Sequence, residues 1–160
     1  PIVYLVDSPG IMVGLAAERA GILRRVSRAL QAIHRATVPV VTVHLRRTFG
    51  LGTMSAGSPD RLSIKLAWPS ALQGAMGLPI EGAAAIMFKD EIAASDDPAA
   101  TLKEIEARLM DEVSIWKTAE NFSVEDVIDP RETRRVIFRW LETAVWSRRA
   151  GAKTGPQYRP

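Results

Sequence analysis

The chain of 160 residues contains no cysteine. This absence excludes disulfide frameworks, thiolate metal sites and a cysteine nucleophile, and it is compatible with a reducing compartment. The sequence also lacks an apolar run of about 18 residues that could span a bilayer and a basic segment followed by an apolar stretch that could act as an export signal. Together these absences favour a cytoplasmic protein with no membrane partner.

Histidine and aromatic residues are scarce as well. The two histidines, His34 and His44, fall on a predicted helix and a predicted strand, where structural roles are expected more often than ligand roles. No motif presents a nucleophile beside its base, and no metal site is predicted. Aromatic residues make up 6% of the chain, so no aromatic platform accompanies the arginines and nucleic acid is not the expected partner.

Neither sign of charge dominates. The formal net charge is +3 and the sequence pI is about 9.6, but the basic residues are spread over several segments and interleaved with acids, as on a solvated surface. One segment is an exception and leaves room for an anionic partner. Its basic residues are Arg24, Arg25, Arg28 and Arg35.

The composition is that of an ordinary globular protein. Hydrophobic residues make up 47% of the chain and charged residues 24%, so neither disorder nor a coiled coil is indicated. We expect one domain over residues 1–148 and a flexible C-terminal tail over 149–160, where glycine and proline recur. Because the first residue is proline and not methionine, the chain is expected to be a piece of a longer polypeptide.

Continuous apolar, β-branched runs predict strands buried on both faces, as in a parallel sheet. The clearest are residues 2–6 and 38–45, and the amphipathic segment 16–36 between them reads as a crossover helix. Further strands are predicted at 62–68, 71–76 and 124–128. Helices are predicted at 81–93, from Asp97-Pro98 onward, and over 131–147 behind a capping box at Asp129-Pro130-Arg131-Glu132.

Two of the predicted strands run directly into glycine-containing loops. The first is followed by Asp7-Ser8-Pro9-Gly10 and then Gly14, and the second by Phe49-Gly50-Leu51-Gly52. Open α/β folds bind ligands at such strand ends, and glycine allows a close approach to backbone N–H groups. A helix starting near Thr53 would add a favourable partial charge, so the second loop could form an oxyanion hole, although on spacing alone a plain turn is the more frequent outcome.

Asp7 is the best-placed carboxylate in the sequence, yet Asp-Ser-Pro-Gly is also an ordinary turn.

Six motifs in order, covering all but the last dozen or so residues, resemble the C-terminal half of the carboxyltransferase subunit of biotin-dependent acyl-CoA carboxylases. They are the segments Asp7–Gly14, Ala36–Pro39, Leu45–Gly52, Ala67–Pro69, Met76–Gly77 and Asp126–Arg135.

The resemblance implies an α/β fold of the crotonase-like (ClpP/crotonase) type, with stacked β-β-α turns, a mostly parallel sheet and flanking helices. It also implies an enzyme, a carboxyltransferase, in which an N-terminal domain holds the acyl-CoA and the C-terminal domain receives carboxybiotin. The biotin is carried on a biotin carboxyl carrier, a biotin carboxylase loads it, and the subunits form a homo-oligomer. The resemblance thus implies that the chain holds half of an active site, with no cofactor attached to it.

In such enzymes carboxybiotin releases carbon dioxide, backbone N–H groups stabilise the ureido oxygen, and the biotin nitrogen takes the α-proton of the thioester. Motif matching assigns the catalytic N–H groups to Leu51 and Gly52. It assigns substrate-binding roles to Gly50, which opens the approach, and to Phe49, Met12 and Gly10 around the biotin.

The sequence leaves three matters open. A biotin-dependent decarboxylase subunit would carry the same motifs. Many relatives have Tyr-Gly-Gly-Ala where this chain has Phe-Gly-Leu-Gly, and the loop after Gly52 is shorter than in a related subset, so a non-catalytic crotonase-like assembly module is a further alternative. The residues specify neither the acyl group nor the number of subunits.

Overall fold

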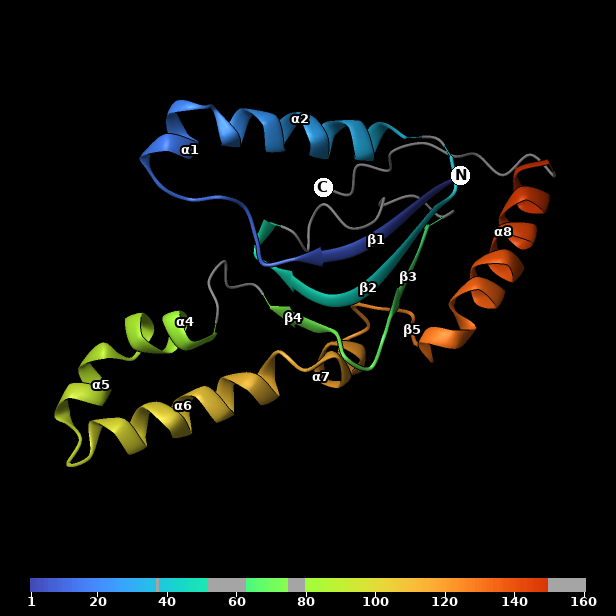
Figure 1. The fold of residues 1–160 in the computed structure, drawn as a ribbon. Coiled ribbons are helices and arrows are strands. Elements are labelled where there is room, and N and C mark those ends of the chain that lie inside the picture. Colours follow the sequence, from blue (N-terminus) through green and yellow to red (C-terminus); the bar gives the residue numbers. More distant parts are fainter. Residues whose placement is uncertain (37, 52–62, 75–79, 150–160) are drawn as a thin grey trace.

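A five-stranded parallel sheet forms the centre of the computed structural model (Figure 1), which describes residues 1–36, 38–51, 63–74 and 80–149. The strand order is β1-β2-β3-β5, and β4 pairs separately with β2. Every pairing of these named strands is parallel, as the apolar runs predict. The strands are β1 (Ile2–Ser8), β2 (Val40–Phe49), β3 (Ser63–Ala67), β4 (Leu72–Gly74) and β5 (Asp126–Val127).

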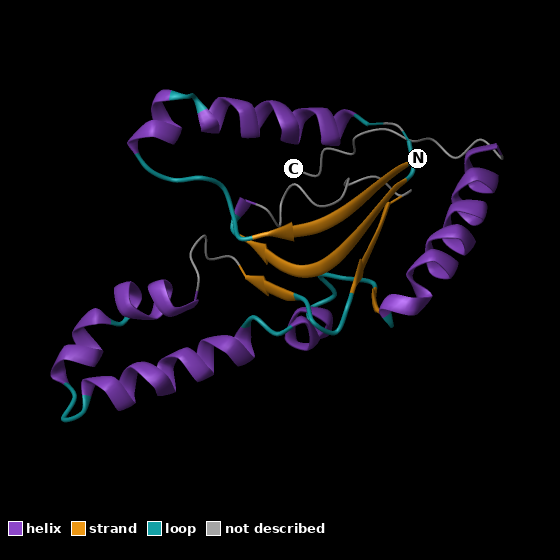
Figure 2. Ribbon diagram, in the orientation of Figure 1, coloured by secondary structure: helices purple, strands orange, loops and turns teal. Residues whose placement is uncertain are grey.

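Helices lie on both sides of this sheet (Figure 2). Two of them, α1 and α2, form an arm on the β1 side, and another group lies beyond β4. The C-terminal helix α8 lies at the end of the sheet opposite to this second group of helices. The helices are α1 (Leu15–Arg19), α2 (Ile22–Arg35), α4 (Ile80–Met87), α5 (Lys89–Ala94), α6 (Pro98–Glu112), α7 (Ile115–Glu120) and α8 (Thr133–Arg149), with a short 3-10 helix, η1, over Pro130–Glu132.

The two faces of the sheet have different cores. Val43 and Leu66 are fully buried and belong to a cluster that α8 covers through Trp140 and its neighbours. Ala67 packs with Ile115 of α7 in a second cluster. A third cluster lies past β4 and joins β2 to α4 and α6.

The predicted strands and helices are confirmed, with differences at their ends. The expected helix over 16–36 is two helices, because Gly21 adopts a left-handed conformation with φ 71° and ends the first one. The expected helix over 81–93 is likewise divided at Phe88. Asp97 caps α6 by accepting hydrogen bonds from the N–H groups of Ala99 and Ala100, as its position before Pro98 predicts.

The expected capping box at 129–132 differs from the observed cap. Asp129 accepts a hydrogen bond from the N–H of Arg131 and caps the 3-10 helix, and α8 begins only at Thr133. The strand β2 reaches Phe49, four residues beyond the expected end at residue 45. The predicted flexible tail from 149 lies outside the described residues, apart from Arg149 itself.

Candidate functional site

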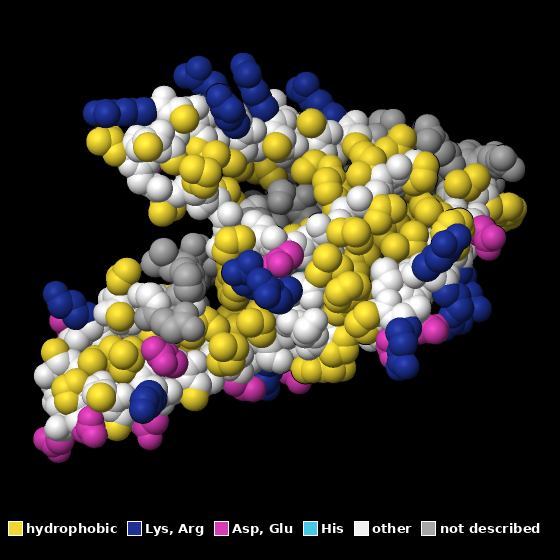
Figure 3. Space-filling view, viewed as in Figure 1, with side chains coloured by type: hydrophobic (Ala, Val, Ile, Leu, Met, Phe, Trp, Pro, Cys, Tyr) yellow, Lys and Arg dark blue, Asp and Glu magenta, His cyan; other side chains and the backbone are white. Residues whose placement is uncertain are grey.

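The carboxyl ends of β1, β2 and β4 lie at one edge of the sheet, because the three strands are parallel (Figure 1). Glycines with positive φ follow two of these strands: Gly10 at 121° and Gly14 at 106° after β1, and Gly50 at 56° after β2. The surface is hollowed near this edge, between the α1 arm and the helices beyond β4 (Figure 3). Strand ends that open into a recess are the usual ligand position in open α/β folds.

The loop after β2 is tied to β4 by its backbone. The N–H of Gly50 donates a 3.0 Å hydrogen bond to the carbonyl oxygen of Gly74, and Leu51 already has helical backbone, earlier than the expected start near Thr53. The N–H of the first residue of a helix has no acceptor within that helix. The Leu51 amide therefore has no acceptor within such a helix, whereas Gly52, the second predicted donor, lies outside the described residues.

The other predicted site residues have different environments. Met12 is 71% exposed in the segment between β1 and α1, and Gly10 shares a turn in which its N–H donates to Ser8 Oγ at 3.3 Å. Phe49 is buried and packs in the cluster that includes Ile80. The structure thus brings Gly50 and Leu51 together at the strand edge, while the Phe49 side chain turns into the core and Met12 lies on the surface.

A bulge interrupts the pairing of β2 with β1 shortly before the loop. Val6 pairs with His44 and Ser8 pairs with Thr48, so one residue of β1 lies opposite three of β2. That one residue is Asp7, whose Oδ1 accepts hydrogen bonds from the backbone N–H of Arg47 at 3.2 Å and from its Nε at 3.1 Å. The hydrogen bond from the Arg47 side chain is the largest factor that lowers the pKa of Asp7.

His44 is a structural residue, as its position in a strand predicts. It is 1% exposed, and its Nδ1 lies 2.9 Å from Thr48 Oγ1 across the bulge. Burial, with a smaller contribution from the charge of Lys65, lowers the pKa of His44 to about 4. The neutral ring is held by Thr48, and its Nε2 has no hydrogen-bond partner among the described residues.

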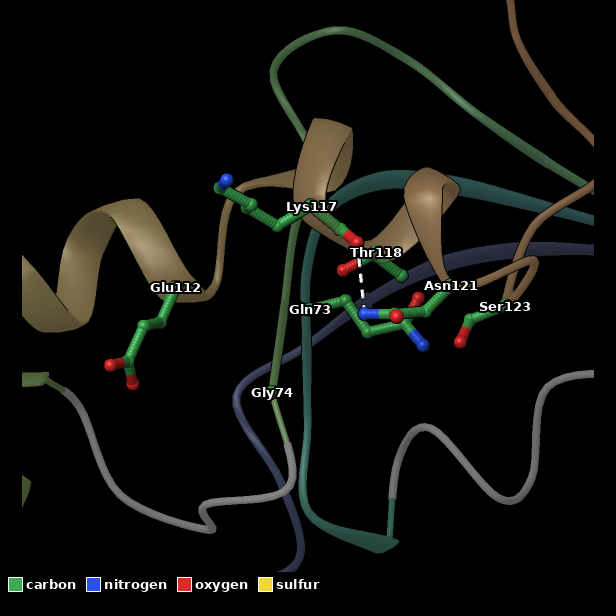
Figure 4. Close-up of a pocket in the computed structure, with 7 residues that line it drawn as sticks. All are labelled: Gln73, Gly74, Glu112, Lys117, Thr118, Asn121 and Ser123. Carbon is green, nitrogen blue, oxygen red and sulfur yellow. Dashed lines mark hydrogen bonds between the residues drawn. The ribbon is translucent and has the colours of Figure 1, made fainter.

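Two hollows flank β4, and the sequence motifs did not indicate them. A cavity of about 270 Å³ lies between β4 and α7. Figure 4 shows the Gln73 side chain extending beneath α7, while the side chains of Glu112 and Lys117 point away from Gln73. The remaining lining residues are Gly74, Thr118, Asn121 and Ser123.

The second hollow, of about 700 Å³, is more apolar and lies on the α4 and α6 side of the same strand. Met87, Phe88 and Leu109 line it, together with Arg108 and Gln73. No local motif predicts either hollow, since their walls come from segments up to 50 residues apart. Gln73 and Gly74 belong to both, so the strand that holds the Gly50 amide also borders both cavities.

Metal-binding clusters and membrane-spanning helices are absent from the described part of the chain. It contains no group of three or more His, Asp or Glu side chains placed to hold a metal ion. None of its helices is both long and apolar enough to cross a membrane.

Comparison with known proteins places the chain in one family. The carboxyl transferase domain model matches residues 1–155. The methylmalonyl-CoA carboxyltransferase 12S subunit of Propionibacterium freudenreichii subsp. shermanii is 41% identical over 144 residues, 89% of this chain. The biotin-dependent acetyl-/propionyl-coenzyme A carboxylase beta5 subunit of Mycobacterium leprae is 36% identical over 143 residues, 86% of this chain.

The crystal structure of transcarboxylase 12S, described as a hexamer assembly, agrees with the fold. It superposes with a TM-score of 0.81 at 36% identity over 99% of this chain and 29% of its own. The chain spans only about a quarter of the curated relatives, 27% of the first and 26% of the second. The crotonase-like α/β fold expected from the motifs is confirmed, and the chain belongs to the carboxyl transferase domain family.

Proposed function

We propose that this chain supplies the biotin-facing half of a carboxyl transfer from carboxybiotin to an acyl-CoA. The N–H groups of Leu51 and Gly52 would stabilise the negative charge on the ureido oxygen. The observation that carries the proposal is the Leu51 amide at the start of a helix, directly after Gly50, whose lack of a side chain permits close approach. Backbone donors fixed in place act on developing charge without reorganisation.

The backbone around Gly50 supports this assignment of donors. The Gly50 N–H donates to the Gly74 carbonyl oxygen at 3.0 Å, so the turn has a fixed partner, and the next N–H along the chain is that of Leu51, the proposed donor. A helical turn starting at Leu51 would add a favourable partial charge at its N-terminus. These features fit an oxygen that accumulates negative charge.

The remaining predicted residues would shape the approach. Gly10 and Gly14 give the neighbouring loop its positive-φ turns, and the exposed Met12 is available to cover a bound ring. Phe49 would act indirectly. Its side chain packs in the core and would support the turn at Gly50. We propose this supporting role together with the earlier assignment of Phe49 to the biotin pocket.

Side-chain chemistry is not required for the step. Carboxybiotin supplies the carboxyl group and, after transfer begins, the base. His44 cannot compete for that role, because it is buried and hydrogen-bonded to Thr48, and its pKa, lowered to about 4 by burial, makes it a weak base. The Leu51 and Gly52 amides therefore need only hold the oxyanion in place.

The partners follow from the relatives and remain part of the proposal. The name of one relative states biotin dependence, and the name of one solved relative states hexamer assembly. We infer that an N-terminal carboxyltransferase domain binds the acyl-CoA, that a biotin carboxyl carrier and a biotin carboxylase supply carboxybiotin, and that the subunits form a homo-oligomer. We infer a cytoplasmic location from the sequence.

Proline substitution tests the donors directly. Leu51→Pro removes one N–H, and the first position of a helix tolerates proline, so the fold should persist. We expect kcat of the complete enzyme to fall by about 10² to 10³-fold. Leu51→Ala, which keeps the N–H and shortens the side chain, is the matched control and should retain most of the activity.

Full carboxyl transfer by folded Leu51→Pro and Gly52→Pro variants would disprove the assignment. Two further measurements address the alternatives left open by the sequence. Assaying ATP-driven carboxylation against decarboxylation in the complete complex distinguishes a carboxylase from a decarboxylase. Failure of free biotin to protect residues 46–56 from hydrogen exchange in an intact assembly would favour the non-catalytic module.

A further inference from the structure

We propose that Asp7 is a positioning residue, which fixes the bulge of β2 through Arg46 and Arg47 and thereby sets where the Leu51 amide lies. This inference rests on the proposed function, since it concerns how the same loop is aimed. It adds a residue to the site that has no contact with the reacting atoms. Three features support it: the geometry of the bulge, the partners of its backbone, and the short segment that connects it to Leu51.

The bulge leaves backbone groups of β2 outside the ladder with β1. Between the pairs Val6–His44 and Ser8–Thr48, β2 has two more residues than β1. Such insertions bend a strand and disrupt local pairing, and they recur next to functional sites. The inserted backbone therefore needs other partners to hold one conformation.

Asp7 supplies those partners from the β1 side. Its Oδ1 accepts the backbone N–H of Arg47 at 3.2 Å and the Nε of the same residue at 3.1 Å. Its Oδ2 lies 3.4 Å from Nε of Arg46. On the other side, Ser70 Oγ donates to the carbonyl oxygen of Leu45 at 3.0 Å. The inserted residues are thus held from both flanks by two side chains.

The bulge is also where β2 changes neighbours. Residues Val40–His44 pair with β3, whereas Arg47–Phe49 pair with β4. The second pairing ends at Gly74, whose carbonyl oxygen receives the Gly50 N–H. A displacement of the Arg47 backbone would pass along this short stiff segment to Leu51. Because catalysis depends on donor position, a misplacement of about 1 Å costs about 10²-fold in rate.

The exposure of Asp7, Arg46 and Arg47 makes it possible to distinguish a positioning role from a role in overall stability. The side chains of Asp7, Arg46 and Arg47 are 36%, 60% and 42% exposed, and exposed ion pairs contribute little to the free energy of unfolding. We therefore expect loss of Asp7 to lower kcat while the melting temperature changes little. A residue that only stabilised the fold would produce the opposite result.

Asp7→Ala in the complete multi-subunit enzyme is the test. We expect kcat to fall by about 10 to 10²-fold, with KM for the acyl-CoA unchanged. Asp7→Asn should recover part of the loss, because its Oδ1 can still accept the Arg47 N–H although the charge is gone. Hydrogen exchange at the Gly50 N–H, which donates to the Gly74 carbonyl oxygen, should be faster in Asp7→Ala than in the unaltered enzyme.

Asp129→Ala is the matched control. Asp129 accepts the backbone N–H and Nε of Arg131, at 2.8 and 3.0 Å, the same contacts that Asp7 makes with Arg47, but it caps η1 and not the bulge. We expect its kcat to stay near that of the unaltered enzyme, with at most a small loss of stability.

Two results would overturn the proposal. One is unaltered kcat and unaltered Gly50 exchange in Asp7→Ala, and the other is a fall in kcat matched by an equal loss in Asp129→Ala. The exchange measurement does not depend on activity. If the unaltered enzyme transferred no carboxyl group, the proposed function would fail, and faster Gly50 exchange in Asp7→Ala would still show that Asp7 holds the loop.

Discussion

The two halves of β2 have different structural roles. Residues Val40–His44 are all buried and pair in regular register with both β1 and β3. Residues Arg47–Phe49 follow the bulge, pair with the short strand β4 and lead to Gly50. The first half is held by apolar burial, which does not depend on direction. The second half also buries Thr48 and Phe49, but the bulge that leads into it depends on directional hydrogen bonds.

We infer from this difference that the first half of β2 stabilises the sheet and that the second half positions the loop. Burial on both faces fixes the first half strongly, because any register slip would expose apolar side chains. The second half can be redirected by a few polar contacts without cost to the main core. A strand built in this way can combine a stable sheet with an accurately aimed loop, and changes in the two halves should have separable effects.

The largest effect on stability is expected where β3 pairs with the first half of β2. Leu66 of β3 is fully buried beside Val43, so Leu66→Ala leaves a cavity and should lower the free energy of unfolding by about 3 kcal/mol. Urea denaturation measures it. Leu23→Ala on α2, where the side chain is 55% exposed, should change it by less than about 0.5 kcal/mol.

The same comparison predicts that kcat of the folded Leu66→Ala enzyme stays close to the unaltered value, because the Leu51 amide is set beyond the bulge. A large fall in kcat below the melting temperature would show that the two halves are not separable.

A pH-dependent effect of comparable size is expected at the boundary between the halves. The pKa of His44 is about 4 in the folded chain, against an ordinary value of 6.5. Since folding depresses this pKa, the neutral ring favours the folded state fully above pH 6.5, and that contribution declines as the pH falls towards 4. The full shift corresponds to about 3 kcal/mol.

Denaturation midpoints between about pH 7 and pH 4 measure this decline. In a His44→Gln variant, which does not titrate in this range, the decline should be shallower. An equal slope in both proteins would mean that other groups account for the acid sensitivity.

The sheet could be predicted from the sequence because its strands carry their own signal. Uninterrupted β-branched runs indicated burial on both faces, and Asp97-Pro98 located the start of α6. The breaks at Gly21 and Phe88 were missed, since each depends on how a helix meets its surroundings and not on its apolar period. Tertiary packing decides such details.

The candidate site was predictable only in part. Glycine after an apolar run pointed to the loop at Gly50, and the family resemblance pointed to its amides. The bulge was not predictable, because Leu45-Arg46-Arg47 reads as a simple continuation of the loop, and its partner Asp7 lies 40 residues away. Pairing at such a distance in sequence leaves no local periodic pattern, so only the strand register reveals it.

The smallest expected effect concerns the neighbour of the second half. At Gly74 an added Cβ would lie 3.0 Å from Val113 Cγ1 and 3.1 Å from Phe49 Cε1, so Gly74→Ala must displace the side chain beneath the Gly50 turn. We expect a loss of about 1 kcal/mol. Gly82→Ala, with open space around the new Cβ inside α4, should instead gain about 0.8 kcal/mol from helix propensity. Denaturation midpoints and kcat of both variants test this: Gly74→Ala should lower kcat as well, whereas equal behaviour of the two alanines would remove β4 from the support of the loop.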